Sequence, residues 1–124
     1  MRMPGELLTK PLIWIGSSLK DFRAFADEVK SEMGYALFLA QRGGRHRKAK
    51  TFKGTGDAGI VEIVEDYRGD TFRAVYTVRF AAVVYVLHAF QKKSKAGIAT
   101  PRTDIRMIEQ RLREAERLYK EEKS

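Results

Sequence analysis

The sequence predicts an α+β fold, in which a small, mostly antiparallel four-stranded sheet packs against an N-terminal helical hairpin and a C-terminal helix. Three observations predict it. Two segments between residues 71 and 91 are rich in Val, Tyr and Phe and alternate with the period of a strand. Residues 18–40 carry apolar side chains at intervals of three and four, the period of a helix. A second helical pattern follows Pro101.

Length and composition place limits on the class of protein. The 124 residues, 44% of them hydrophobic, are expected to form one domain over 1–124, with 1–10 and 120–124 loose. The net charge of +8 favours a polyanionic partner, nucleic acid before membrane. Without cysteine, and with only two histidines, we expect no metal site and no cofactor. No apolar run is long enough for a membrane span or a signal peptide, so we expect a cytoplasmic protein.

The N-terminal third is predicted to contain a strand and then helices. Residues 10–16 form a short strand with Pro11 at its entry, where a missing N–H is tolerated. Ser18 is predicted to cap the helix that follows, and Gly34 to kink it or divide it into a hairpin. The helix should end at residues 43–44, both glycine. Its apolar stripe is formed by Leu19, Phe22, Ala26, Val29, Met33, Leu37 and Ala40.

Residues 43–59 are strongly basic and show no helical or strand period. One interpretation is a solvated, mobile loop; the other, which we favour, is an arm that follows an RNA backbone by releasing counterions. In either case we expect His46 to be solvated. The final GTGDAG is not a P-loop, because no Lys-Ser/Thr follows it and a strand comes next. The expected RNA-binding residues are Arg45, Arg47, Lys48, Lys50 and Lys53, with Arg79 from the sheet.

Three antiparallel strands should follow at residues 59–66, 71–80 and 83–91. If the last turn holds an even number of residues, Tyr76 lies opposite Leu87 and one face is apolar throughout. The opposite face should be exposed and should carry a lateral row Glu62–Val75–His88, with Arg73 and Lys92 beside it. A carboxylate, an imidazole, a guanidinium and an amine would then share one surface of the sheet.

The C-terminal part is predicted to be a second basic loop at 92–99 and then a helix. Thr100 is suited to the N-cap and Pro101 to the first helical position. The charged residues of this helix follow the pattern of a solvent-facing surface, and none was assigned chemistry. The buried seam should be formed by Ile105, Ile108, Leu112, Ala115 and Tyr119.

Three stretches carry a resemblance to a known family. Residues 50–54 (KTFKG) look like a leucine-lysine-glycine segment, and residues 72–76 (FRAVY) look like a tyrosine-arginine-x-x-tyrosine strand. Residues 85–94 (YVLHAFQKKS), followed by Thr100-Pro101, are the most specific. Together with the order of elements, from residue 10 to about residue 116, they resemble the RelE/ParE toxin superfamily and its phage-derived, HigB-like branch.

The resemblance implies the toxin of a type II toxin–antitoxin pair, which cleaves mRNA on the ribosome. It also implies a small antitoxin as partner, usually with a helix-turn-helix domain, and operator DNA bound only through that antitoxin. Arg73 matches the family's strand arginine that contacts the scissile phosphate, and Lys92 or Lys93 matches a second catalytic cation. Glu62 and Val64 stand where RelE has lysines, and residues 95–100 lack its C-terminal tyrosine.

Chemistry indicates what such a site needs. Metal-free RNA cleavage requires a base for the 2′-OH, cations for the phosphorane and an acid for the leaving oxygen. His88 or Glu62 could act as base or acid, with Arg73 and Lys92 or Lys93 as the cations. Alternatively, His88 is a packed strand histidine, and Glu62 only pairs with Arg73.

Two other functions stay open at this stage. A ParE-like inhibitor of DNA gyrase would have the same fold and would cut nothing. A non-catalytic RNA-binding module would need exposed aromatic rings, for which Tyr67 and Phe90 are the only good candidates in the sequence.

Overall fold

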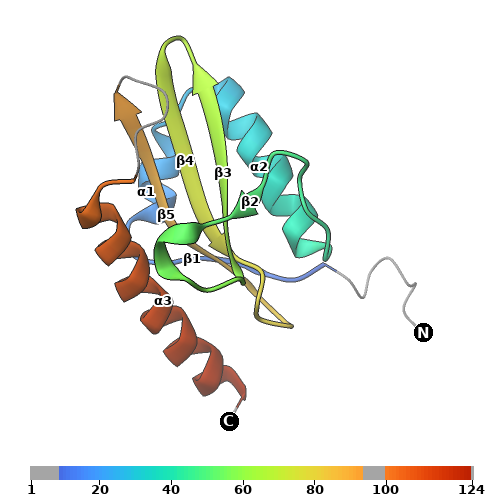
Figure 1. Ribbon diagram of the computed structural model, residues 1–124. Helices are drawn as coiled ribbons and strands as arrows, with labels where there is room; N and C mark the ends of the chain where they lie inside the picture. Colours follow the sequence, from blue (N-terminus) through green and yellow to red (C-terminus); the bar gives the residue numbers. More distant parts are fainter. Residues whose placement is uncertain (1–8, 94–99, 124) are drawn as a thin grey trace.

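The computed structural model describes residues 9–93 and 100–123, which form a mixed sheet with helices on both of its faces (Figure 1). The sheet has five strands in the order β1-β5-β4-β3-β2. The α+β class is therefore confirmed, while the predicted number of four strands is wrong. The elements in chain order are β1 (Leu12–Trp14), α1 (Ser18–Arg23), α2 (Asp27–Gln41), β2 (Lys50–Thr51), the 3₁₀ turn η2 (Lys53–Thr55), β3 (Ile60–Tyr67), β4 (Asp70–Thr77), β5 (Val84–Lys93) and α3 (Arg102–Lys123).

The extra strand comes from the basic segment. Two of its residues pair antiparallel with β3, Lys50 opposite Glu62 and Thr51 opposite Val61. The next residue, Phe52, is buried, and its ring lies only 2.7 Å from where a Cβ on Gly54 would be. The sequence predicted an irregular segment because its lysines interrupt the alternation of apolar and polar residues that is typical of a strand. One apolar residue, Phe52, is enough to hold it against the sheet.

The helical hairpin bends at a different place from the predicted one. Gly34 lies inside α2, and the break falls at residues 24–26, where Ala26 is extended with ψ of 148°. Ser18 is not a cap either. It is buried, and its hydroxyl donates to the Val86 carbonyl oxygen at 3.2 Å. The end of α2 is as predicted, since Gly43 follows it with a left-handed φ of +82°.

Strands β4 and β5 keep the predicted register only in part. Val75 lies opposite His88, but a bulge follows, and Tyr76 lies opposite Val86 instead of Leu87. The hydroxyl of Thr77 accepts the N–H of Tyr85 at 3.0 Å next to this irregularity. The connection after β4 is a loop over residues 78–83, longer than the predicted two-residue turn.

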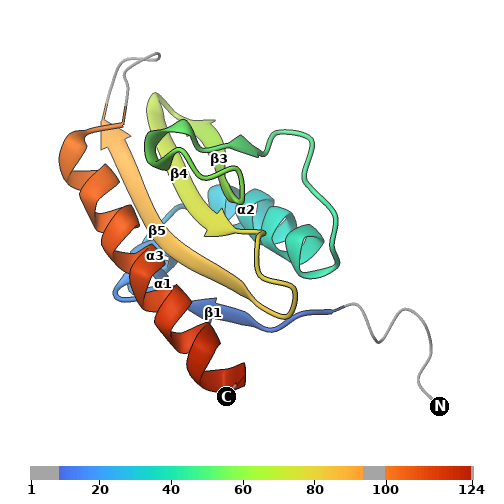
Figure 2. The same ribbon diagram turned by 60° about the horizontal axis from the view of Figure 1, so that its bottom comes forward.

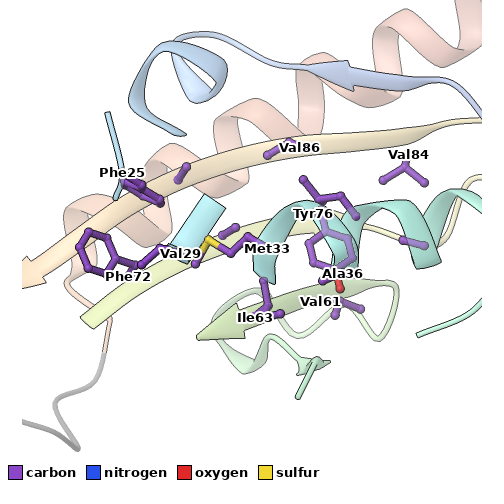
Figure 3. Packing of buried hydrophobic residues seen from close by; sticks show 14 residues of the cluster. Phe25, Val29, Met33, Ala36, Val61, Ile63, Phe72, Tyr76, Val84 and Val86 are labelled. Atoms are coloured by element: carbon purple, nitrogen blue, oxygen red, sulfur yellow. The ribbon is translucent and has the colours of Figure 1, made fainter. Parts of the chain in front are cut away.

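Both faces of the sheet are covered, which overturns the prediction of an exposed polar face. Helices α1 and α2 pack on one face, where Met33 and Ala36 meet Val61, Ile63 and neighbouring apolar residues (Figure 3). Helix α3 packs on the other face (Figure 2). Its predicted seam is confirmed: Ile108 and Ala115 are fully buried, and the remaining seam residues pack against them.

The ends of β5 and α3 also differ from the prediction. Lys92 and Lys93 are the last residues of β5, not part of a loop, and the rest of the predicted second basic loop lies outside the described residues. Helix α3 continues to Lys123, so residues 120–123, expected to be loose, extend the helix. No described helix is long and apolar enough to cross a membrane.

Two methionines test the assignment of the core. Met33 is completely buried and Met107 is 37% exposed. Met33→Ala is expected to lower the free energy of unfolding by about 2–5 kcal/mol, because it removes buried atoms and leaves a cavity. Met107→Ala, the matched control, should change it by less than about 0.5 kcal/mol. Denaturant titration measures both, and equal effects would contradict this core.

Tyr76 makes the stability of the fold depend on pH in alkaline solution. Its side chain is buried, its hydroxyl has no hydrogen-bond partner among the described residues, and burial raises its pKa from 10.0 to about 12. The unfolded chain therefore releases this proton first, and stability is lost as the pH rises from 10 towards 12. In denaturant titrations over this range, Tyr76→Phe should lose less stability than the wild type. Parallel losses in the two proteins would show that Tyr76 ionises as easily in the fold as outside it.

Candidate functional site

A row of polar residues crosses the face of the sheet that α3 partly covers. Glu62 on β3 lies opposite Val75 on β4, which lies opposite His88 on β5. The row predicted from the sequence is therefore confirmed. The structure extends it by one strand, because Lys50 on β2 lies opposite Glu62. Glu62 and His88 are buried, so the row is enclosed and not spread over an open surface.

Arg73 and Glu62 form an ion pair at the centre of this face. Arg73 Nη1 donates to Glu62 Oε1 at 2.8 Å, and the side chains are only 14% and 10% exposed. Such a charge-assisted bond, shielded from most water, is stronger than a surface pair. The guanidinium has five N–H donors, so one bond to Glu62 leaves it able to bind a second anion. Its buried Nε has no hydrogen-bond partner within residues 9–93 and 100–123.

Lys92 lies on the same face as Arg73. It stands opposite Thr71 in the sheet, and strand alternation places both next to the Arg73 position. Burial lowers the pKa of Lys92, the positive charge of Arg73 lowers it further, and Asp104 opposes both. A lysine with a lowered pKa gives up its proton more readily than an ordinary one. Lys93 is the last residue of β5, opposite Asp70.

His88 has both ring nitrogens engaged by α3. Nε2 lies 2.7 Å from Asp104 Oδ1, and Nδ1 lies 3.4 Å from Arg111 Nη1. A guanidinium can only donate, so Nδ1 is the acceptor and the proton is on Nε2, where it is donated to Asp104. The ring also stacks on Phe90, with centroids 4.6 Å apart. This is the packed strand histidine that the sequence left open, and it attaches β5 to α3.

Arg111 extends this connection to the start of α1. It donates to the Leu87 carbonyl oxygen at 2.9 Å and to the Ser17 hydroxyl at 3.0 Å. The Ser17 hydroxyl in turn donates to Asp21. Burial lowers the pKa of Arg111, and the negative charge of Asp21 opposes that shift. Sequence reasoning missed both Asp104 and Arg111. Their spacing of seven, two helical turns on one face, was the available signal.

The predicted RNA-binding cations divide into two groups. Arg79 bonds to Asp57 and Glu116, and Lys48 pairs with Glu65 at 2.7 Å. The Lys48 side chain is 43% exposed while Glu65 is 14% exposed, so a phosphate can approach this pair from the lysine side. In the described part of the chain, the other four cations are exposed and have no ion-pair partner; they are Arg45, Arg47, Lys50 and Lys53.

His46 is not solvated, contrary to the prediction. It is buried, its Nε2 lies 2.6 Å from Glu32 Oε1, and its Nδ1 accepts the N–H of Lys48 at 3.0 Å. The ring also meets Tyr35 edge-on. The basic segment is therefore attached to α2 near the start of the segment, and the sequence contained no periodic signal for this contact.

Two cavities of the described chain lie close to this face, one of them beside His88. Within residues 9–93 and 100–123, no group of three or more His, Asp or Glu side chains could hold a metal ion. A cavity of about 670 Å³ lies between α3 and the end of β1, lined by Gly16, Met107 and Arg111 among others. None of the predicted catalytic residues lines it. A smaller cavity of about 340 Å³ is lined by Asp21, His88 and Phe90 among others, so one predicted catalytic residue, His88, lies beside a cavity.

Comparisons with known proteins give one family and one solved structure. Residues 20–113 match the family model described as "Phage derived protein Gp49-like (DUF891)". The chain is also similar to a free-state mutant of the E. coli toxin RelE, with 23% identity, 72% of this chain and 87% of that chain covered, and a TM-score of 0.49. No curated protein matches the sequence.

The bond between His88 and Asp104 can be tested by stability. Asp104→Ala should lower the free energy of unfolding by about 1–3 kcal/mol, because the buried Nε2–H loses its acceptor. Asp104→Asn keeps an acceptor oxygen and should recover much of that loss. The control is Asp27→Ala. The Asp27 side chain is 96% exposed, so its removal should change the free energy of unfolding very little. If Asp104→Asn were as destabilising as Asp104→Ala, the bond would depend on the charge of Asp104. The assignment of a neutral His88 ring with its proton on Nε2 would then be wrong.

Proposed function

Because the chain belongs to the phage-derived Gp49-like family, a family of RelE-type toxins, we propose that it is the toxin of a type II toxin–antitoxin system and cleaves mRNA on the ribosome. One observation carries the catalytic part of the proposal. A carboxylate and a guanidinium form a largely shielded ion pair, Glu62–Arg73, and Arg73 contributes to lowering the pKa of Lys92. Base, phosphate-binding cation and acid are thus available on one face without a metal.

The proposed reaction is an internal transesterification of RNA. The 2′-oxygen attacks the adjacent phosphorus and loses its proton to a base, while the P–O5′ bond breaks and the leaving 5′-oxygen takes a proton from an acid. The products are a 2′,3′-cyclic phosphate and a 5′-hydroxyl. Protons balance, because the base gains one and the acid loses one.

Each residue has a proposed role in this scheme. Glu62 is the general base, since its bond to Arg73 brings its carboxylate next to the phosphate that Arg73 would bind. Arg73 donates to the phosphorane with its remaining N–H groups, as a planar fork suits two phosphate oxygens. Lys92, with its lowered pKa, is the general acid. His88 is a positioning residue, because both of its nitrogens are engaged by α3.

The RNA chain on either side of the cleaved bond needs cations along its path. Lys50 is next to Glu62 across the sheet, and Lys53 follows on the exposed surface of η2. We propose that these two residues hold phosphates adjacent to the cleavage point. Lys93 and Arg79, also predicted for this surface, receive no role in the scheme, Arg79 because two carboxylates already bind it.

The proposed partners follow from the same function. An antitoxin, of the helix-turn-helix type in this branch, would neutralise the toxin and provide any contact with operator DNA. The ribosome would present the mRNA in the cytoplasm. Inhibition of DNA gyrase is the competing function, and the catalytic test separates the two.

Primer extension on a translated mRNA tests the proposal, with and without ribosomes. Arg73→Ala should lower the cleavage rate by roughly 10²–10³-fold, because a preorganised cation is lost from the transition state. The matched control is Arg113→Ala, which removes the same charge from the exposed surface of α3 and should leave the rate unchanged.

The outcomes separate three functions. Cuts within the reading frame that require ribosomes and disappear with Arg73→Ala support the proposal. Cuts on naked RNA keep the nuclease and exclude the ribosome. Intact mRNA with folded wild-type protein rejects the nuclease, and a gyrase supercoiling assay then decides whether the protein is an inhibitor of the ParE kind.

A further inference from the structure

Two exposed aromatic rings lie next to each other on the outer face of α2. Tyr35 is 56% exposed and Phe38 is 47% exposed, the largest values among the exposed large hydrophobic residues of the described chain. Their spacing of three places them on one side of the helix. The opposite side of α2 carries the buried Met33 and Leu37, so the rings serve no purpose in the core.

One cation lies over the Phe38 ring, and two more belong to the segment that contacts the Tyr35 ring through His46. The guanidinium of Arg42, one turn further along α2, lies 6.0 Å from the centroid of the Phe38 ring. The basic segment then turns back and runs beside α2 on its way to β2 (Figure 1). It is held there by buried His46, which bonds to Glu32 and meets the Tyr35 ring edge-on. Arg45 and Arg47 flank His46 in the chain; both are exposed and have no ion pair with any residue that the structure describes.

We propose that Tyr35, Phe38, Arg42, Arg45 and Arg47, here called the α2 platform, form a second binding surface, which takes an unpaired segment of RNA. The proposal rests on the proposed function and deepens it. Unpaired bases stack on exposed rings, and arginines neutralise the phosphates between them. A toxin that uses this surface would hold RNA on α2 as well as at Arg73, on the opposite face of the sheet.

RNA fits this surface better than a protein helix does. A partner helix needs an apolar groove to receive its side chains, whereas these rings stand on the convex side of α2. The charge of the surface also favours a polyanion. Asp27 and Glu28 lie at the far end of α2, and the nearest carboxylate, Glu32, is occupied by His46.

The test is the affinity for a 2′-O-methyl oligonucleotide of about twelve nucleotides, followed by fluorescence anisotropy. This probe cannot be cleaved through a 2′-hydroxyl, so binding is measured independently of catalysis. Tyr35→Ala and Phe38→Ala should each raise the Kd about tenfold, within the range of base–aromatic stacking. Tyr35→Phe and Phe38→Tyr, which keep the rings, should retain the wild-type Kd. Thermal unfolding checks that each variant is folded.

Two controls separate stacking from general effects. Met107→Ala removes another exposed apolar side chain, on α3, and should leave the Kd unchanged. A duplex of the same length should lose little affinity in Tyr35→Ala or Phe38→Ala, because its bases are already stacked. An unchanged Kd in the two alanine variants, or equal losses for duplex and single strand, would overturn the proposal. So would alanine variants that lose only antitoxin binding, since the surface would then belong to a protein.

The inference and the proposed function fail in different ways. If wild-type protein leaves mRNA intact on the ribosome but the oligonucleotide still binds through the rings, the nuclease is rejected and the α2 platform remains. If Arg73→Ala abolishes cleavage but Tyr35→Ala and Phe38→Ala bind like wild type, the nuclease remains and the α2 platform is rejected.

Discussion

The burial of β5 on both faces is the constraint on which the rest of the structure depends. From Val84 to Ala89, every residue of this strand is buried. Its neighbours β1 and β4 pair with it on either side, α1 and α2 cover one face, and α3 covers the other. At about 1.5–3 kcal/mol for each large apolar side chain removed from water, this one strand contributes much of the driving force for bringing the helices together.

That burial also explains the polar network around His88. A strand covered on both faces cannot keep an imidazole in water, and an unpaired buried polar group costs about 1–3 kcal/mol. Asp104 and Arg111 meet the two ring nitrogens, and Arg111 also takes the Leu87 carbonyl oxygen and the Ser17 hydroxyl. The network therefore aligns α3 with β5, and α3 in turn limits how much of the Arg73–Glu62 face meets solvent. This geometry supports the proposed positioning role of His88, because both ring nitrogens are engaged by α3.

The cations of the protein fall into two groups, those paired with carboxylates and those exposed at the surface. Some cations are paired within the protein, as Arg79 is with Asp57 and Glu116, and these pairs join the loop after β4 to α3. Others are exposed and have no carboxylate partner in the part of the chain that the structure describes, as is true of Arg45 and Arg47 on either side of buried His46. A net charge of +8 says that a polyanion would be attracted, but only the pairing of each cation shows where it could bind.

The sequence by itself determined the α+β class, the helical stripes, the seam of α3 and the lateral row Glu62–Val75–His88, because these follow from local periodicity and a short turn. It could not assign the segment Val84–Leu87, whose residues are apolar on both sides, so the bulge at Tyr76 and the covered second face were missed. It also could not place Asp104, Arg111 or His46, whose partners lie on other elements. Only the tertiary structure decided which charged side chains are paired and which rings are exposed, because solvent exposure depends on what packs across a face and not on the spacing along it.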